Sequence, residues 1–236
     1  MVQDLSTVSL VDFIESLALQ AWIAYLSGEL QTAKNLFQKA QDLERDLGSK
    51  YVPKILYLYA IRGIRYADYL RRLGDVDYAR RVTEANLRIC ERERWVNHIS
   101  LCHRVLGDLD ADTEQPDLAR QHYKEAIKKA RETSRRDILI PVLASRGRFL
   151  AQQGDVRAAH SDLNEAQNYA NTSGYSIYEV DIRVRLAWAH LKDGNFSAAR
   201  TEAEQAKCMS AEMGYHWGQV DAEQVLAVLD LDKKVV

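Results

Sequence analysis

Hydrophobic residues recur at three- and four-residue steps along most of the chain, which is the pattern of helices that bury one face. Ser9 is predicted to cap the first helix, and Gly28 is predicted to end it. The apolar positions between them are Leu10, Phe13, Ile14, Leu17, Ala21 and Tyr25. Only three prolines interrupt the 236 residues, so the whole chain is predicted to be helical.

A short turn pattern recurs at a nearly constant period. Gly28, Gly74, Gly154 and Gly194 occupy equivalent turn positions, and Glu114 takes the same place in the middle copy. Successive turns are 46, 40, 40 and 40 residues apart. Five residues after each turn stands an alanine: Ala33, Ala79, Ala119, Ala159 and Ala199. A period in this range predicts a solenoid built from repeated hairpins.

Small residues occupy further fixed places in each copy. Seven positions before the turns stand Ala21, Ala67, Gly107, Gly147 and Ala187. Twelve positions after the turns stand Ala40, Asn86, Ala126, Ala166 and Ala206, and twenty after stand Gly48, Arg94, Ser134, Gly174 and Gly214. Small side chains let two helix backbones approach closely. The turn glycines suit positive φ, and the later glycines are expected to end the second helix of each hairpin.

This spacing resembles tetratricopeptide (TPR) repeats from about residue 9 to the end. The ordinary repeat of that family has about 34 residues, whereas these have 40. The longer form resembles the helical sensor arrays of bacterial signal-transduction ATPases, including the activator of maltose genes. The resemblance implies an all-α fold, a right-handed α-solenoid whose first helices line a concave wall.

The repeats define the expected domain organisation. Residues 1–8 are predicted to be a lead-in and residues 9–236 a single solenoid domain. The five hairpins are expected at about residues 9–48, 49–94, 95–134, 135–174 and 175–214, with Pro53 in the first turn of the second hairpin. A last helix at 215–230 matches the first helix of a sixth repeat. We expect this helix to cap the stack, unless the chain has been cut from something longer.

Composition and charge favour a soluble, cytoplasmic protein. The net charge of −2 argues against direct nucleic-acid binding, and no apolar run is long enough for a membrane span. The N-terminus lacks the pattern of a signal peptide, and the three cysteines form no spaced framework. Residues 62–94 are rich in arginine, but interspersed acids favour a solvated face over a surface for an acidic peptide.

The sequence contains no pattern that specifies catalysis. It has no glycine-rich phosphate loop, nucleophile elbow or paired-histidine zinc helix. His98 and Cys102 share a helix face but are two ligands short of a tetrahedral metal site. The alternating acids that begin at Asp108 fail the calcium-loop template, because Thr113 and Ala119 stand where glycine and glutamate are required. We therefore expect no enzyme activity, no cofactor and no metal.

The resemblance to the family places eight candidate partner-binding residues on the concave face: Trp22, Tyr25, Asp68, Arg71, Arg104, Asp108, Arg148 and Trp188. The two tryptophans fit either partner binding or packing between repeats. The three arginines are expected to be exposed, because a buried, unpaired guanidinium is costly.

These observations predict a non-catalytic protein–protein interaction module that binds a peptide or partner helix, with a sensor or scaffold role as the most specific version. One alternative is a self-assembling array, a homo-oligomer formed through the terminal helices. Another is a small-ligand sensor domain of a signalling protein, with its pocket inside the superhelix.

Overall fold

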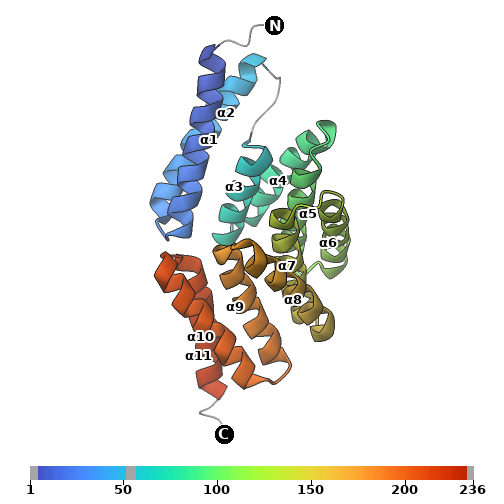
Figure 1. The fold of residues 1–236 in the computed structure, drawn as a ribbon. Helices are drawn as coiled ribbons and strands as arrows, with labels where there is room; N and C mark the ends of the chain where they lie inside the picture. The colour runs from blue at the N-terminus through green and yellow to red at the C-terminus, as the bar shows by residue number, and fades with distance from the viewer. Residues whose placement is uncertain (1–4, 52–56, 233–236) are drawn as a thin grey trace.

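The computed structural model describes residues 5–51 and 57–232, which form eleven α-helices and no strand (Figure 1). The helices are α1 (Leu5–Leu26), α2 (Leu30–Tyr51), α3 (Ala60–Arg72), α4 (Val76–Arg92), α5 (Val96–Asp112), α6 (Pro116–Arg131), α7 (Arg136–Gln152), α8 (Val156–Ser173), α9 (Ser176–Lys192), α10 (Phe196–Met213) and α11 (His216–Asp232).

Neighbouring helices pack in pairs, from α1 with α2 to α9 with α10, and α11 packs on the last pair. The first helices of the pairs also contact one another in series: α1, α3, α5, α7, α9 and α11. These odd-numbered helices therefore form an inner layer, and the even-numbered helices lie outside it. The fold is an α-solenoid of five hairpins followed by a terminal helix, as predicted.

The recurrent small residues lie at the helix-to-helix contacts. Ala33, Ala79, Ala119, Ala159 and Ala199 are all completely buried. A Cβ atom added to Gly147 would lie 2.7 Å from Cγ of Leu163, and one added to Gly107 would lie 2.9 Å from Cε1 of Tyr123. The paired backbones are too close for a larger side chain at these positions. The predicted role of the small residues is confirmed.

The turns have the backbone conformation that the glycines predicted. Gly28, Gly74, Gly154 and Gly194 have φ values between 73° and 84°, and Glu114 adopts φ 56° at the equivalent place. Where the second helices end, Gly174 and Gly214 adopt φ 69° and 66°, whereas Arg94 and Ser134 adopt 57° and 53°. A non-glycine residue with positive φ is strained. The second and third copies therefore carry strained residues, Arg94, Glu114 and Ser134, where other copies use glycine.

Three helix boundaries differ from the prediction. α1 begins at Leu5, so Ser9 lies inside the helix, because no glycine or proline interrupts these residues. α2 continues past Gly48 to Tyr51, since one glycine costs a helix only about 1 kcal/mol. α3 begins at Ala60, and the predicted first-turn position of Pro53 lies outside the described residues.

Asn86 explains where α3 begins. Its side chain accepts a hydrogen bond from the Ala60 amide at 2.7 Å and donates one to the Ala60 carbonyl at 2.9 Å. Asn86 is almost fully buried, at the position where the other copies have alanine. Gly63 lets the chain approach closely, since a Cβ there would lie 2.3 Å from the Leu58 carbonyl oxygen. Asn86, which replaces the alanine of the other copies, thus connects α4 to the start of α3 through two hydrogen bonds.

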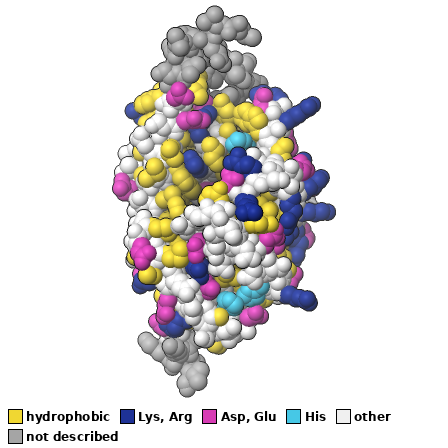
Figure 2. Space-filling model, in the orientation of Figure 1, with side chains coloured by type: hydrophobic (Ala, Val, Ile, Leu, Met, Phe, Trp, Pro, Cys, Tyr) yellow, Lys and Arg dark blue, Asp and Glu magenta, His cyan; other side chains and the backbone are white. Residues whose placement is uncertain are grey.

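The arginine-rich segment is not simply a solvated face, which corrects the sequence interpretation. Arg62 is buried and pairs with Glu15 at 2.8 Å and Glu44 at 3.1 Å. Arg80 donates to the buried Asp110 at 2.8 Å. These bonds connect different helices, so part of the basic segment joins neighbouring repeats. On the face that Figure 2 shows, other Lys and Arg side chains project along the right-hand edge.

Candidate binding cavity

The curvature of the solenoid brings α11 back to α1, so that the two lie end to end in Figure 1. The indole Nε1 of Trp217 donates to the Tyr25 carbonyl at 2.8 Å. Arg72 of α3 donates to both carboxylate oxygens of Asp221, and its guanidinium lies 4.2 Å from the centre of the Trp217 ring. We call these interactions the α1–α11 contact. They join the last helix to the first two hairpins.

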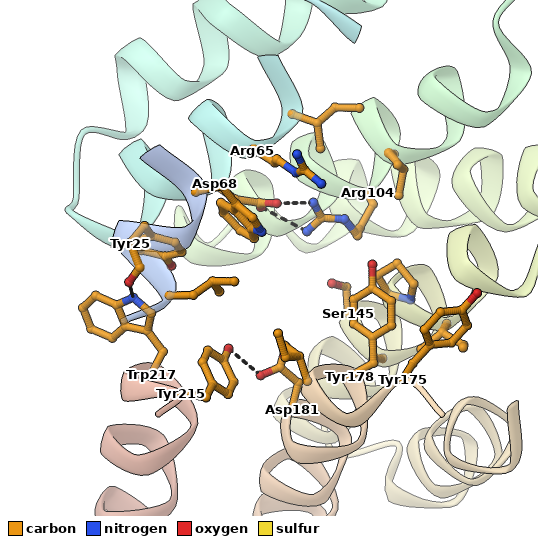
Figure 3. A pocket seen from close by; sticks show the side chains of 18 of the residues that line it. Tyr25, Arg65, Asp68, Arg104, Ser145, Tyr175, Tyr178, Asp181, Tyr215 and Trp217 are labelled. Atoms are coloured by element: carbon orange, nitrogen blue, oxygen red, sulfur yellow. Dashed lines mark hydrogen bonds and ion pairs between the residues drawn. The ribbon is translucent and has the colours of Figure 1, made fainter. Parts of the chain in front are cut away.

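Two cavities lie along the inner layer beside the α1–α11 contact. The larger has a volume of about 570 Å³ and is shown in Figure 3, and the smaller has about 410 Å³. Both are lined by odd-numbered helices, with the short segments before α9 and α11 also contributing to the larger one. Five residues belong to both linings: Arg71, Arg72, Asp181, Arg185 and Asp221. The cavities therefore adjoin.

The structure brings most of the predicted concave residues to these cavities. The larger cavity is lined by Trp22, Tyr25, Asp68, Arg71 and Arg104, and the smaller by Arg71, Arg148 and Trp188. Asp108 lines neither cavity and is buried at 2% exposure. The residues predicted for one continuous groove thus lie around two adjoining cavities, with Asp108 behind the wall.

The expectation that the three wall arginines are exposed is wrong for Arg104, which is only 8% exposed. Its guanidinium donates to both carboxylate oxygens of Asp68 and, at 3.0 Å, to Asp108 (Figure 3 shows the Asp68 bonds). Asp108 also accepts from the Tyr123 hydroxyl at 2.8 Å and from the Ser145 hydroxyl at 3.2 Å. Burial is possible because this guanidinium is paired.

Arg71 and Arg148 belong to the same network and are only partly exposed. Arg148 donates to Asp108 and Asp112, at 3.2 Å in each case, and Arg71 pairs with Asp112. Burial by itself would raise the pKa of Asp108, but Arg71, Arg148 and Arg104 together hold that pKa well below its usual range. Asp108 is therefore an ionised centre that connects α3, α5 and α7.

Two cationic side chains in the larger cavity form no ion pair with the described residues. The lining contains Arg65, Arg71, Arg72, Arg104 and Arg185 against Asp68, Asp181 and Asp221. Arg71, Arg72 and Arg104 form the ion pairs described above. Among the described residues, neither Arg65 nor Arg185 forms an ion pair or side-chain hydrogen bond, and Figure 3 draws Arg65 with no dashed line. Burial lowers the pKa of Arg65.

Asp181 is the acidic side chain of the lining that interacts electrostatically with Arg185. Its carboxylate accepts a hydrogen bond from the Tyr215 hydroxyl at 2.8 Å (Figure 3). Burial raises the pKa of Asp181, although Arg185 and the Tyr215 hydrogen bond oppose that increase. With five arginines and three aspartates in its lining, the cavity has an excess of positive charge.

Aromatic rings stand at opposite sides of the cavity (Figure 3). On one side the centre of the Tyr25 ring lies 5.0 Å from that of Trp22 and 5.4 Å from that of Trp217. On the other side are Tyr175 and Tyr178, 5.9 Å apart. Such rings provide apolar contact surface around the cavity.

Sequence reasoning missed Arg65, Asp181, Arg185, Tyr215 and Trp217. One signal was available for three of them, because Arg65, Asp181 and Arg185 lie on first helices, to which the resemblance assigned the concave wall. Tyr215 and Trp217 lie at the start of the terminal helix, which was predicted only to cap the stack. Nothing in the repeat spacing indicated that this helix would reach α1.

The described residues offer no metal site and no membrane-spanning helix. They contain no group of three or more His, Cys, Asp or Glu side chains arranged to hold a metal ion. Cys102 is buried and His98 is half-buried on α5. None of the described helices combines the length and the apolar character that a membrane crossing requires.

These features define the class of the protein as an all-helical solenoid with a lined inner cavity. No protein-family model matches the chain, and no curated protein matches it. Among solved structures, it is similar to BtubC (BKLC) from P. vanneervenii, with a TM-score of 0.59 and 18% sequence identity. The match covers 90% of this chain and 94% of that one. At this identity the similarity concerns the fold alone.

Proposed function

We propose that this protein is a non-catalytic binding protein that holds a small ligand in its inner cavity. The observation that supports this most directly is the α1–α11 contact, in which Trp217 and Asp221 bind Tyr25 and Arg72 across the inner layer. The contact leaves an interior space of about 570 Å³. Cavities of a few hundred to about 1,000 Å³ with apolar and a few polar groups are typical of small-ligand sites.

The predicted peptide groove is the competing proposal. A peptide laid along the whole inner layer would have to displace the α1–α11 contact. Its predicted contact residues Arg71, Arg104 and Arg148 already bind carboxylates of the same chain. Charge reversal at these positions would break the internal network, so it would test stability rather than partner binding. A small ligand between the hairpins can bind without displacing the α1–α11 contact and without breaking the internal ion pairs of these arginines.

The repeat spacing supports a more specific version of the proposal. We propose a right-handed, TPR-like superhelix that serves as a cytoplasmic sensor domain in signal transduction. In this role, a ligand that bridges the first and last hairpins would stabilise one curvature of the solenoid. A binding partner would then recognise that curvature.

The test is a thermal-denaturation screen against pools of small metabolites, with Ile61→Trp as the matched variant. Ile61 is half-buried and lines the larger cavity, so the indole is expected to fill part of the space. A ligand at 100 times its dissociation constant stabilises a protein by about 2.7 kcal/mol. We expect at least one pool to raise the midpoint of the parent protein and not that of Ile61→Trp. Equal shifts in both proteins would contradict binding in the cavity.

Light scattering across a concentration series tests the self-assembly alternative. A constant monomer mass is expected, because the start of α11 already contacts α1 within the same chain. A mass that rises with concentration would favour the self-assembling array. Loss of that rise in Trp217→Ala would place the association at the terminal helix.

A further inference from the structure

We infer that the larger cavity recognises a small organic anion, in which a carboxylate, phosphate or sulfonate group is joined to an aromatic ring. This inference rests on the proposed function and specifies its ligand class. It is carried by Arg65 and Arg185, the two cavity cations that form no ion pair or side-chain hydrogen bond among the described residues. An unpaired, partly buried guanidinium is destabilising unless an anion comes to it.

The charge balance of the wall indicates which groups are available to a ligand. Arg72 and Arg104 are each bound by two oxygens of one carboxylate, from Asp221 and Asp68 respectively. Arg65 extends from α3 and Arg185 from α9, so these two cations come from different hairpins around one space. Guanidinium groups bind carboxylates, phosphates and sulfonates through paired N–H donors. An anion between them would connect the two hairpins.

The first turn of α9 adds to the same preference. Gly174, Tyr175, Ser176, Ile177 and Tyr178 all line the cavity. Tyr175, at the cap position, supplies no side-chain hydrogen bond to the helix, in contrast to Asp155 and Asn195 at the starts of α8 and α10. The backbone N–H groups of a helix N-terminus favour negative charge. The N-terminus of α9 therefore adds to the preference of the two arginines for an anion. It would not form a binding site by itself.

The aromatic side chains specify the rest of the ligand. Tyr25 and Trp217 stand on one side of the space, and Tyr175 and Tyr178 on the other (Figure 3). A planar ring stacks favourably on such side chains, whereas an aliphatic anion would leave this surface uncovered. The ligand class is therefore an aromatic anion rather than a free inorganic anion.

The experiment compares two dyes that differ in charge. The first, 8-anilinonaphthalene-1-sulfonate, is an aromatic anion, and the second, N-phenyl-1-naphthylamine, is the same ring system without the sulfonate. Binding is measured by calorimetry to the whole chain and to the Arg65→Met, Arg185→Met, Arg157→Met and Ile61→Trp variants. Arg157 is the control, because it is exposed on α8 and lines neither cavity.

We expect one molecule of the sulfonate to bind at least ten times more tightly than the neutral dye. Arg65→Met and Arg185→Met should each weaken sulfonate binding roughly tenfold and leave the neutral dye unchanged, since a charge-assisted hydrogen bond is lost. Arg157→Met should change neither affinity. Without ligand, Arg65→Met should be at least as heat-stable as the parent, because it removes an unpaired, desolvated charge.

Other outcomes separate the two proposals. If both dyes bind equally well and both are lost in Ile61→Trp, the cavity binds ligands but the anion inference is wrong. If neither dye binds, the aromatic-anion inference is wrong, and the metabolite screen alone tests the cavity. If the sulfonate binds Ile61→Trp as well as the parent, the dye does not bind in the cavity and the inference is overturned. A large fall in the thermal midpoint of ligand-free Arg65→Met would assign that residue a structural role and overturn the inference.

Discussion

The indole nitrogen of Trp217 donates a hydrogen bond to the backbone carbonyl of Tyr25, 192 residues earlier in the chain. The bond joins the terminal helix to the first hairpin, next to the pairing of Arg72 with Asp221. These two pairs connect opposite ends of the sequence, and all four residues line the larger cavity. The stability of the whole chain should therefore depend on them.

Asp221→Ala is expected to lower the free energy of unfolding by about 1–2 kcal/mol, because a charge-assisted, two-oxygen pair is lost at partly exposed side chains. Urea unfolding of Asp221→Ala, Arg72→Met and the double variant measures the coupling between them. The exposed pair of Arg92 with Glu93 is the control, and its removal should be almost neutral. Additive effects of the Arg72 and Asp221 changes would show that the pair does not stabilise the fold.

Ala159→Leu is expected to lower the free energy of unfolding by roughly 1–3 kcal/mol, because it overpacks the contact between α7 and α8. Ala159 is fully buried, and the adjoining Gly147 has no room even for a methyl group. The matched control is Ala211→Leu on an exposed position of α10. Equal denaturation midpoints for the two variants would contradict the repeat register.

Glu114→Gly is expected to raise the free energy of unfolding by about 1 kcal/mol, because Glu114 adopts φ 56° where glycine is unstrained. The reverse comparison is Gly154→Ala, which should be destabilising through backbone strain alone. A Cβ at Gly154 meets no atom within 4 Å, so no clash contributes. Thermal denaturation should show a higher midpoint for Glu114→Gly and a lower one for Gly154→Ala. A lower midpoint for Glu114→Gly would contradict backbone strain at Glu114.

The free energy of unfolding should fall as the pH is lowered from about 6.5 to about 4. Burial, followed by the neighbouring His122, lowers the pKa of His103 to about 4, and the two Nδ1 atoms lie 3.0 Å apart. Glu125 opposes this shift and Lys129 adds to it. In the unfolded chain the imidazole has its ordinary pKa of about 6.5, so the unfolded state takes up a proton first. The contribution of His103 to the free energy of unfolding is therefore fully present above pH 6.5 and is lost as the pH falls toward 4.

The measurement is urea unfolding of the parent and of His103→Gln at pH 7 and pH 4.5. The variant should lose less stability between the two pH values, although other groups still titrate. Helical circular dichroism at pH 7 checks that the variant folds. Identical losses in the two proteins would mean that the His103–His122 pair does not contribute to acid sensitivity.

Much of the fold could be predicted from the sequence because the information is local. The alanine five residues after each turn and the small residue seven before it specify how two adjacent helices pack. Each hairpin repeats this relationship, so one correct register predicts all five. Two of the three boundary errors occurred where the repeat is broken: at Ala60, where Asn86 sets the start of α3, and at Gly48, which α2 passes without ending.

The candidate site was predicted only in part. Trp22, Tyr25 and Asp68 were placed on the inner wall because they lie on first helices, and they do line the larger cavity. Arg104 was placed on the same wall but expected to be exposed, because the sequence did not show that Asp68 and Asp108 would be within reach. Pairing between hairpins depends on the angle between successive repeats, which spacing along one chain does not report.

The sequence by itself therefore determined the helices, their pairing and the small residues at their contacts, since these depend on residues a few positions apart. Its prediction of a right-handed superhelix remains a prediction. Only the tertiary structure decided that α11 meets α1, that the wall arginines are paired, and that Arg65 and Arg185 are not. The physical reason is that small rotations between neighbouring repeats add up over the whole solenoid.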